Sequence, residues 1–329
     1  MNKISYTKAN FQKIIRYIFI YGFGRTIVKA LGRARPKFRV WLFLNFPRYL
    51  RNGKTVGIIG CGQHSFSSIA FFLSTSTQSK IQFALDTNKE ASASFALAYN
   101  TKDISSSYNS NKERIEVPDL IYISSNHASH TEYAIDFLKR GADVFIEKPI
   151  SINEQQINML SKAVNDSKNK VYVGYNRPHS PSIALIKKYK TDQDLPLTLS
   201  CFITGHFIPE DHWYRNSAEG TRIVANLGHW IDLSAHMLLW RERIADKLNI
   251  SISYSNINTP SDNINVNITS PFGDLISLTF TSRSEPFEGV NETINFQQGD
   301  LIAKIDDFRT TKIWKNSFFK KFTHWPKNN

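Results

Sequence analysis

The feature that most constrains the fold is a regular alternation of short apolar runs and helical segments between residues 55 and 175. The runs are rich in β-branched residues, which favours strands, and the segments between them are long enough for crossover helices. The predicted strands are Thr55–Ile59, Ile81–Leu85, Leu120–Ile123, Asp143–Ile146 and Lys170–Tyr175. Strands that alternate with helices pair in parallel, so this region predicts a doubly wound α/β sheet.

A second pattern begins after Pro181, where apolar and polar residues alternate along each run. Such alternation is typical of antiparallel strands with one buried and one solvated face. The predicted strands are Thr198–Ile203, Ile250–Tyr254, Asn263–Thr269, Leu275–Thr281 and Leu301–Ile305. A long helix is expected from about Thr221 to Leu239, largely buried because apolar residues surround it. This half predicts an α+β domain with an open, mainly antiparallel sheet.

The net positive charge of the chain comes from its first 54 residues. They contain thirteen Lys or Arg and no Asp or Glu, which leaves 28 basic and 28 acidic residues in the remainder. The body is therefore formally neutral and carries no recognised nucleic-acid motif, which argues against DNA or RNA as a partner. The two cysteines suit a reducing compartment, so we expect a cytoplasmic protein. Its apolar runs are far shorter than the roughly 20 residues of a membrane-spanning helix.

A glycine-rich turn closes the first predicted strand. Gly60 and Gly62 occupy the first two positions of a G-x-G-x-x-G fingerprint and Ser65 the third small position, with Gln63 and His64 between them. The first glycine permits the tight turn, and the second lets a pyrophosphate approach the backbone. The helix that follows supplies unpaired N–H donors. A strand, this turn and a helix in that order predict a dinucleotide-binding Rossmann unit.

An acidic residue, Asp86, ends the second predicted strand, 24 residues after Gly62. Its carboxylate is placed to accept hydrogen bonds from the adenosine ribose and would repel a 2′-phosphate, which predicts NAD rather than NADP. We therefore expect three parts in the chain. They are a basic amphipathic leader over residues 1–54, an NAD-binding Rossmann domain over 55–177, and an α+β substrate and oligomerisation domain over 178–329.

Short stretches with distinctive sequences are Val56–Ser65, Ile121–His130, Val144–Ile150, Val173–Arg177 and Gly228–Asp232. Together they resemble the glucose-fructose oxidoreductase, inositol dehydrogenase and rhizopine-catabolism (Gfo/Idh/MocA) family of NAD(P)-dependent sugar oxidoreductases. The Glu147-Lys148-Pro149 turn after a Rossmann strand is the most specific of these motifs. The resemblance covers about residues 55–315 and leaves the leader outside. It implies hydride transfer between a sugar carbon and the nicotinamide ring.

The resemblance also implies which residues perform the reaction. Lys148 would lie at the reacting hydroxyl, where an ammonium group can stabilise the developing alkoxide. His229 matches the helix histidine that transfers a proton, and Asp232, one turn further along, would orient the imidazole or bond the sugar across a domain cleft. Further candidates for cofactor binding are Ser124, Asn126, His130 and Glu147, together with Lys148 itself.

The chain departs from the family at Ala225, where many members have an aspartate four residues before the histidine. Lys148 and His229 then transfer protons without that carboxylate, or Asn226 and Asp232 replace it in holding the sugar. This departure resembles the members associated with sugar nucleotides and polysaccharide assembly. Two alternatives stay open. One is an enzyme that recycles tightly bound NAD during epimerisation, elimination or hydrolysis, and the other is a non-catalytic NAD-binding sensor or scaffold.

Basic and aromatic residues before the histidine helix are candidates for substrate binding. Such residues suit a phosphate or carboxylate beside a stacked base or sugar, although the aromatics could equally fill a domain interface. The candidates are Trp213, Tyr214, Arg215 and Arg222, together with Tyr175, Arg177, Asn226 and His229. His229, Asp232 and His236 share one helical face, but no fourth ligand accompanies them, so no metal site is predicted.

The leader predicts a short amphipathic helix followed, after two glycines, by a second helical stretch to Leu31. A basic linker around Pro36 and an aromatic segment from Trp41 to Tyr49 come next. Two interpretations stay open: peripheral association with the anionic inner face of a membrane, or extra helices packed across the enzyme or its oligomer partner. A homo-oligomer is expected, because the open C-terminal sheet commonly mediates assembly in the family.

Overall fold

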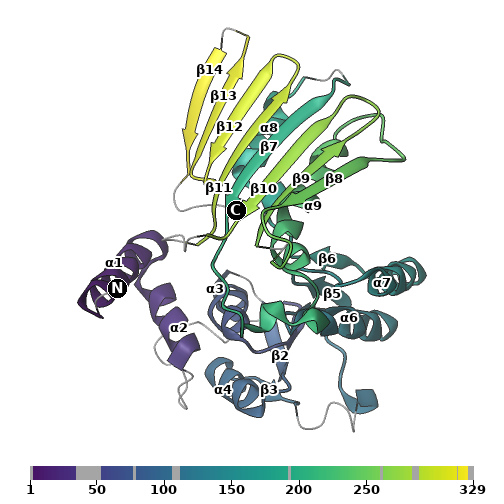
Figure 1. Cartoon of the computed structure of the whole chain (residues 1–329). Coiled ribbons are helices and arrows are strands. Elements are labelled where there is room, and N and C mark those ends of the chain that lie inside the picture. The colour runs from purple at the N-terminus through teal and green to yellow at the C-terminus, as the bar shows by residue number, and fades with distance from the viewer. Residues whose placement is uncertain are drawn as a thin grey trace. The chain divides into compact units, whose positions relative to one another are not determined.

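The structure is a computed structural model that describes residues 3–34, 53–76, 79–105, 112–191, 194–259, 262–283, 289–316 and 318–324. The chain forms two compact units. The first contains Met1–Gly174 and Ala218–Gly220, and the second contains Tyr175–Ser217 and Thr221–Asn329 (Figure 1). The predicted linker around Pro36 and the aromatic segment from Trp41 to Tyr49 lie outside the described residues.

The first unit contains a parallel sheet of six described strands. They are β1 (Thr55–Ile59), β2 (Lys80–Leu85), β3 (Lys102–Asp103), β4 (Leu120–Ile123), β5 (Asp143–Ile146) and β6 (Val171–Val173). The spatial order is β3-β2-β1-β4-β5-β6, with each neighbouring pair parallel. The doubly wound sheet predicted from the sequence is thus confirmed. Strand order reverses beside β1, and ligands bind such sheets at the carboxyl ends of the strands at this switch point.

Helices connect these strands. They are the π-helix η2 (Ser65–Ile69), α3 (Ala70–Ser76), α4 (Lys89–Tyr99), the short 3₁₀ helices η3 (Lys112–Arg114) and η4 (His127–Ser129), α6 (His130–Lys139) and α7 (Glu154–Asp166). Asn88 and Asn153 cap α4 and α7 by accepting backbone N–H bonds, which satisfies donors that lack a partner within the helix. Gly141 follows α6 with φ of +91°, a conformation that favours glycine at a helix end.

The leader forms two helices, α1 (Lys3–Tyr21) and α2 (Phe23–Ala34), which contact each other. Val28 of α2 is fully buried in an apolar cluster with Phe66, Ile69 and Phe95 of the Rossmann unit. A Cβ on Gly32 would lie 3.2 Å from Cδ1 of Phe66, so α2 and the π-helix η2 approach closely at this glycine. The second leader helix is therefore built into the first unit. Among the described residues, no helix is long and apolar enough to cross a membrane.

The second unit contains an eight-stranded sheet in its described part. The strands are β7 (Leu197–Thr204), β8 (Asn249–Tyr254), β9 (Asn263–Thr269), β10 (Leu275–Thr281), β11 (Asn291–Gln298), β12 (Leu301–Asp306), β13 (Thr310–Lys315) and β14 (Phe318–Thr323). The order is β14-β13-β12-β11-β7-β10-β9-β8, and β7 pairs with β10 in parallel while the other neighbours are antiparallel. The open, mainly antiparallel sheet is confirmed, but β11, β13 and β14 were not predicted.

Two helices, α8 (Pro181–Tyr189) and α9 (Gly228–Leu238), lie on one face of this sheet (Figure 1). The long helix predicted from Thr221 is in fact a π-helix, η8 (Ile223–Leu227), that continues into α9. Its buried residues Trp230, Leu233, Ser234 and Met237 form one stripe. The expectation that the helix is buried on most sides is wrong, because Ile231 and Leu239 are exposed. Short 3₁₀ turns, η5 (Arg177–His179), η6 (Trp213–Arg215) and η7 (Ser217–Glu219), complete this region.

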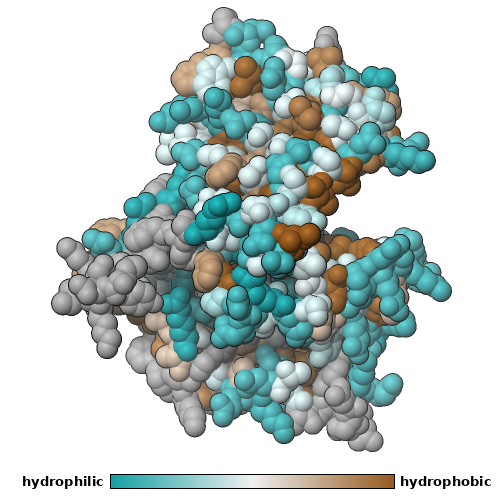
Figure 2. Space-filling model, in the orientation of Figure 1, coloured by the Kyte–Doolittle hydropathy of each residue, from teal (hydrophilic) through white to brown (hydrophobic). Residues whose placement is uncertain are grey.

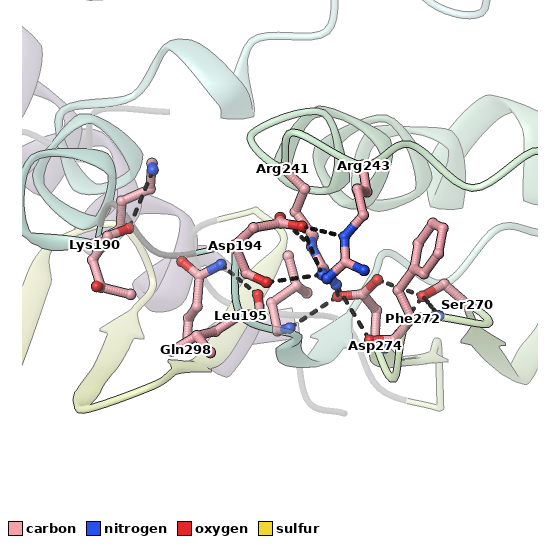
Figure 3. A network of polar contacts seen from close by, with 11 residues as sticks. Lys190, Asp194, Leu195, Arg241, Arg243, Ser270, Phe272, Asp274 and Gln298 are labelled. Atoms are coloured by element: carbon pink, nitrogen blue, oxygen red, sulfur yellow. Dashed lines mark hydrogen bonds and ion pairs between the residues drawn. The ribbon is translucent and has the colours of Figure 1, made fainter.

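A charge network in the second unit is centred on the buried guanidinium of Arg241 (Figure 3). Arg241 donates to Asp194 at 2.9 Å and to Asp274 at 2.6 Å, while Arg243 donates to Asp194 at 2.8 Å. Asp274 also accepts the backbone N–H of Leu197, the first residue of β7. The two guanidinium groups hold the pKa of Asp194 well below its usual range. The network therefore ties the turn before β10 to the start of β7.

Candidate active site

The glycine turn after β1 leaves open space on one side. Gly60 has φ of +86°, and a Cβ there would lie 2.4 Å from the carbonyl oxygen of Ser124, so this position requires glycine. A Cβ on Gly62 would meet nothing within 4 Å. Gln63 and His64, which begin the following helix, are exposed. The turn thus presents free backbone at a helix N-terminus, which is what a dinucleotide pyrophosphate needs.

Two serines fasten this turn to the neighbouring strand. The hydroxyl groups of Ser65 and Ser124 lie 2.6 Å apart, and that of Ser65 donates to the carbonyl oxygen of Gly60. Ser65 is buried, and Ser124 follows β4 directly. Both residues were predicted to bind the cofactor. Their contacts support a role in shaping the turn on which a cofactor would lie.

Asp86 follows β2 at the edge where the glycine turn lies. Its Oδ2 accepts the backbone N–H of Cys61 at 2.6 Å, and its Oδ1 accepts that of Asn88 at 2.8 Å. The backbone N–H of Asp86 donates to the hydroxyl of Ser105, a contact that the sequence did not predict. These bonds fix the carboxylate beside the turn. Each of its oxygens keeps a further lone pair that can accept a ribose hydroxyl.

The lysine turn follows β5. The backbone N–H of Glu147 continues the sheet by donating to Ile123 at 2.8 Å, and Lys148 next to it is half-buried. A Cβ on Gly174 would lie 2.8 Å from Oε2 of Glu147, so the glycine in the predicted VGYNR motif makes room for this carboxylate. Nε2 of His64 lies 3.5 Å from Oε1 of Glu147. The structure thus brings the glycine turn and the lysine turn together within the first unit.

His130 braces the same turn and is itself buried. Its Nδ1 lies 2.7 Å from the carbonyl oxygen of Pro149, and its Nε2 lies 3.1 Å from that of Ser125. Burial lowers the pKa of His130. The imidazole therefore connects the segment after β4 to the Pro149-Ile150 peptide, directly after Lys148. This geometry favours a positioning role over the direct cofactor contact that the sequence predicted.

The segment after β4 is held by a residue that the sequence analysis missed, Glu219. Its Oε1 accepts from Nδ2 of Asn126 at 2.8 Å, and its Oε2 accepts from the backbone N–H of Ala128 at 3.1 Å. The other amide atom of Asn126, Oδ1, accepts from the hydroxyl of Ser129. Asn126 was predicted to contact the cofactor, but both ends of its amide are engaged within the protein. Glu219 lies more than 90 residues away in sequence, so no local pattern reveals it.

His127 lies beside this contact and is almost fully buried. Burial, followed by the positive charge of Lys148, lowers the pKa of His127 to about 4. The imidazole is thus neutral near pH 7, and its Nδ1 lies 3.2 Å from the carbonyl oxygen of Glu219. If Nδ1 carries the proton, it donates to that carbonyl.

In the second unit, His229 lies near the start of α9, immediately after the π-helix η8. Its ring packs edge-on against Tyr175, with 5.6 Å between the centroids. A Cβ on Gly228 would lie 3.2 Å from Oη of Tyr175, so the glycine allows the phenol to approach the helix. The predicted pair Tyr175 and His229 is therefore adjacent. π-Helices insert an extra residue per turn and often occur at functional sites.

Asp232 and His236 follow on the same helix and are partly buried. Burial raises the pKa of Asp232, and burial, with the charges of His179 and Lys187, lowers that of His236. The rings of His179 and His236 lie 6.4 Å apart. Within the described residues, no group of three or more His, Cys, Asp or Glu side chains could hold a metal ion.

Arg177 was predicted to bind substrate, but the structure buries it. Its Nε and Nη2 donate to the two carboxylate oxygens of Glu292 at 2.8 and 3.1 Å. The guanidinium lies 4.0 Å from the ring of Trp230, whose Nε1 donates to the same carboxylate at 2.8 Å. Glu292 is fully buried. The predicted role of Arg177 is corrected accordingly: its charge is neutralised inside the second unit and helps to hold α9 on β11.

Arg215 and Arg222 were predicted to bind a phosphate or carboxylate of the substrate. Both bond Asp262 instead, Arg215 at 3.1 Å and Arg222 at 2.7 Å. Arg222 is buried and also donates to the hydroxyl of Ser282. The geometry therefore favours a structural role for this pair. Trp213 stays nearly half exposed and packs edge-on against Tyr214, with 4.3 Å between the centroids.

Ala225 and Asn226 lie in the π-helix that precedes His229. The methyl group of Ala225 is buried, whereas Asn226 is partly exposed. A carboxylate in place of Ala225 would have to be desolvated, which is costly without a partner. Oδ1 of Asn226 is buried and accepts no hydrogen bond within the described residues, which leaves it available to a ligand group that donates.

The strand order, the open glycine turn and the lysine turn define the class of the first unit, a dinucleotide-binding domain of the oxidoreductase type. A family model described as "Oxidoreductase family, NAD-binding Rossmann fold" (GFO_IDH_MocA) matches residues 54–175. The chain thus carries the NAD-binding Rossmann domain of the Gfo/Idh/MocA family, and the resemblance seen in the sequence is confirmed.

Curated relatives match over short stretches. Oxidoreductase P35 of Formosa agariphila is 34% identical over 86 residues, which is 25% of this chain and 27% of that protein. Inositol 2-dehydrogenase of Rhizobium meliloti is 30% identical over 70 residues, or 21% of each chain. The match therefore spans about a quarter of the length of these relatives.

Solved structures match over most of the chain. A UDP-N-acetylglucosamine 3-dehydrogenase from Acidithiobacillus ferrooxidans has a TM-score of 0.65 and 15% identity, with 82% of both chains covered. At this identity the similarity establishes the fold. Because the match covers 82% of this chain, the shared fold includes strands and helices beyond the Rossmann domain.

Proposed function

We propose that the chain is an NAD-dependent oxidoreductase that transfers hydride between a CH–OH group of a sugar or nucleotide sugar and nicotinamide. One observation carries this proposal: the open glycine turn, Asp86 and Lys148 follow β1, β2 and β5 at the same edge of one parallel sheet. Bound NAD would supply the hydride acceptor. Gly62, Asp86 and Glu147 are the residues that would hold it.

Lys148 is the proposed catalytic residue of the first unit. An ammonium group can donate a hydrogen bond to the substrate hydroxyl and stabilise the alkoxide that develops as hydride leaves. His130 fixes the Pro149 carbonyl that follows it, and Glu147 is fixed by the sheet. The backbone on both sides of Lys148 is thus held in place, which suits a group that must reach a reacting atom with little freedom.

His229 is the proposed proton-transfer residue of the second unit, and Asp232 its partner on the same helix. A histidine exchanges protons near neutral pH, and a carboxylate one turn away can orient it or bond a sugar hydroxyl. Tyr175 packs against the imidazole and presents its own hydroxyl nearby. Asn226 and Trp213 are the further groups proposed to contact substrate. This role for Trp213 is supported by its exposed ring.

We infer NAD rather than NADP from the position of Asp86, which lies beside the turn that would receive the pyrophosphate. A 2′-phosphate placed near this carboxylate would meet like charge. Titration of NADH and NADPH by fluorescence should show tighter binding of NADH. Asp86→Ser should narrow that preference by at least about tenfold, which corresponds to about 1.4 kcal/mol. Equal affinities in the unchanged protein would contradict the inference.

The proposed substrate class is a nucleotide sugar used in glycan assembly. It is supported by the fold shared with the UDP-N-acetylglucosamine 3-dehydrogenase, while the inositol dehydrogenase relative supports a cyclic polyol. A screen of nucleotide sugars and inositols for NADH formation distinguishes the two. NAD that copurifies without NADH release would indicate a cofactor recycled within the site, as in epimerisation, elimination or hydrolysis.

Lys148→Ala tests whether the protein is an enzyme, with Lys162→Ala on the exposed surface of α7 as the matched control. Loss of a general acid–base group predicts a fall in turnover of at least about 100-fold in the first variant and none in the second. NAD binding and thermal stability should be retained in both. Turnover or in-cell function that survives Lys148→Ala would favour a non-catalytic sensor or scaffold.

We further propose that the enzyme works as a cytoplasmic homo-oligomer. The face of the eight-stranded sheet without helices exposes Phe202, Leu275 and Ile302, and Figure 2 shows hydrophobic patches on this unit. Apolar residues exposed on an otherwise solvated sheet face favour association. Phe202→Lys should shift the sedimentation coefficient toward the monomer. In the cytoplasm, the basic leader would meet the anionic inner surface of the membrane.

A further inference from the structure

The first leader helix, α1, exposes an apolar stripe. Phe11, Ile14, Ile15 and Phe19 are 63%, 52%, 37% and 80% exposed. At 100° per residue these four positions fall within an arc of roughly 140° on one side of the helix. Side chains of this size are rarely left in water together on one face. The stripe therefore indicates a binding surface rather than an ordinary solvated helix face.

Another part of the surface of α1 is already used for packing within the hairpin. The rings of Tyr17 and Tyr21 lie 4.5 Å apart. Lys29 and Arg25 of α2 lie over them, at 4.1 Å from the Tyr17 centroid and 4.7 Å from the Tyr21 centroid. These cation–π contacts connect α1 to α2 and involve none of the four residues of the stripe.

The hairpin is also fixed to the body of the enzyme. Val28 is fully buried in the apolar cluster of the Rossmann unit, and Gly32 allows α2 to lie against Phe66. Arg25 further contacts Phe72 of α3, with its guanidinium 4.6 Å from the ring centroid. The stripe on α1 is therefore presented on a folded platform.

Charge identifies the partner that fits this stripe. The thirteen basic residues of the first 54 have no acidic neighbour in that segment, and the α1–α2 hairpin alone carries seven of them. A second copy of the hairpin placed on the stripe would bring two sets of like charges together. An anionic lipid surface satisfies both features, because the apolar side chains enter the acyl boundary while the cations face lipid headgroups.

We propose that Phe11, Ile14, Ile15 and Phe19 form a docking surface for a membrane that contains anionic lipid, which holds the Rossmann unit at that membrane. The proposed function enters this inference at one point only: it gives a reason for the enzyme to work at a membrane, where glycan precursors are used. Binding itself requires neither NAD nor turnover. It therefore stands or falls separately from the proposed reaction.

The test is co-sedimentation of the full chain with two kinds of vesicle. One contains phosphatidylcholine alone, and the other also contains about 30% phosphatidylglycerol, which makes its surface anionic. The variants are Phe11→Ser/Phe19→Ser and, as a matched control, Phe207→Ser, whose ring is exposed in the second unit. Both changes lie on exposed side chains, so folding should be preserved, which circular dichroism checks. NADH formation, followed in parallel, reports on the proposed reaction alone.

The unchanged chain and Phe207→Ser should pellet with the anionic vesicles, less at high salt, and not with neutral ones. The double variant should partition at least tenfold more weakly. Equal pelleting of the double variant, or equal pelleting on neutral vesicles, would overturn the proposal. A double variant that instead changes the sedimentation coefficient without lipid would also overturn it, by showing that the stripe joins copies of the chain.

Discussion

Replacement of Arg177 by methionine separates the role that the sequence suggested from the role that the structure supports. Methionine keeps the apolar stem but removes the guanidinium that bonds both oxygens of Glu292. Glu292 is fully buried, so its charge would lose the guanidinium, while the Trp230 indole N–H would still donate to it. Breaking one side of a buried ion pair costs about 3–5 kcal/mol, because the remaining charge stays desolvated.

The size of the effect can be converted into a melting shift. For a unit of this length, 1 kcal/mol corresponds to roughly 2–4 °C, so Arg177→Met should lower the melting temperature of the second unit by roughly 6–20 °C. Urea unfolding followed by tryptophan fluorescence gives the free energy directly. The control is Arg243→Met, since this guanidinium is 64% exposed beside Asp194 and should contribute under about 1 kcal/mol.

A second variant identifies the cause. Arg177→Met combined with Glu292→Leu removes both charges, and the double replacement should recover most of the lost stability. A substrate-binding role gives the opposite result: a raised KM for the sugar with the unfolding free energy within about 0.5 kcal/mol of the unchanged protein. That outcome would refute the structural assignment of Arg177.

Further predictions concern the two units separately. Glu219→Ala removes the acceptor of the Ala128 N–H, which should lower the free energy of unfolding by about 1 kcal/mol and raise the KM for NAD. Glu219→Gln should change both quantities less. Unchanged kinetics in both variants would reject a positioning role. Arg241→Ala should cost about 3–5 kcal/mol by leaving Asp274 unpaired, far more than Arg243→Ala, as measured by urea unfolding. Burial lowers the pKa of His127 to about 4, whereas an unfolded histidine has a pKa near 6.5. The free energy of unfolding should therefore be at its full value above about pH 6.5 and fall by up to about 3 kcal/mol as the pH drops toward 4. His127→Asn should flatten that decline, and an unchanged pH profile would count against the buried neutral imidazole.

Strands with a clear apolar pattern could be predicted from the sequence, and their predicted ends agree with those in the structure. β1, β4, β5, β9 and β10 have the predicted bounds, because each is an uninterrupted or strictly alternating run between polar turns. β11 was missed because two of its inward positions are Glu292 and Gln298. Their burial depends on Arg177 and on the Leu195 carbonyl, both over 100 residues away. A period-two pattern with polar residues on its inner face lacks the apolar alternation that predicts a strand.

The candidate site shows the same division. The glycine turn and the lysine turn are local motifs, so their residues could be named in advance, and the structure brings them together in the first unit. Side chains that depend on a distant partner could not be assigned. Arg215 and Arg222 look like anion-binding residues until Asp262 is seen between them, and Asn126 looks like a cofactor ligand until Glu219 is seen to hold its amide.

The burial of Val28 has a consequence for the order in which the chain can fold during synthesis. The cluster that encloses it includes Phe95 and Ala98, about 70 residues further along. At roughly 5–20 residues per second, α2 would leave the ribosome some 4–14 s before the last of these partners. For that interval the hairpin has no nucleotide-binding core to dock on. The leader is made first but can take its place only after the core of the domain it covers has formed.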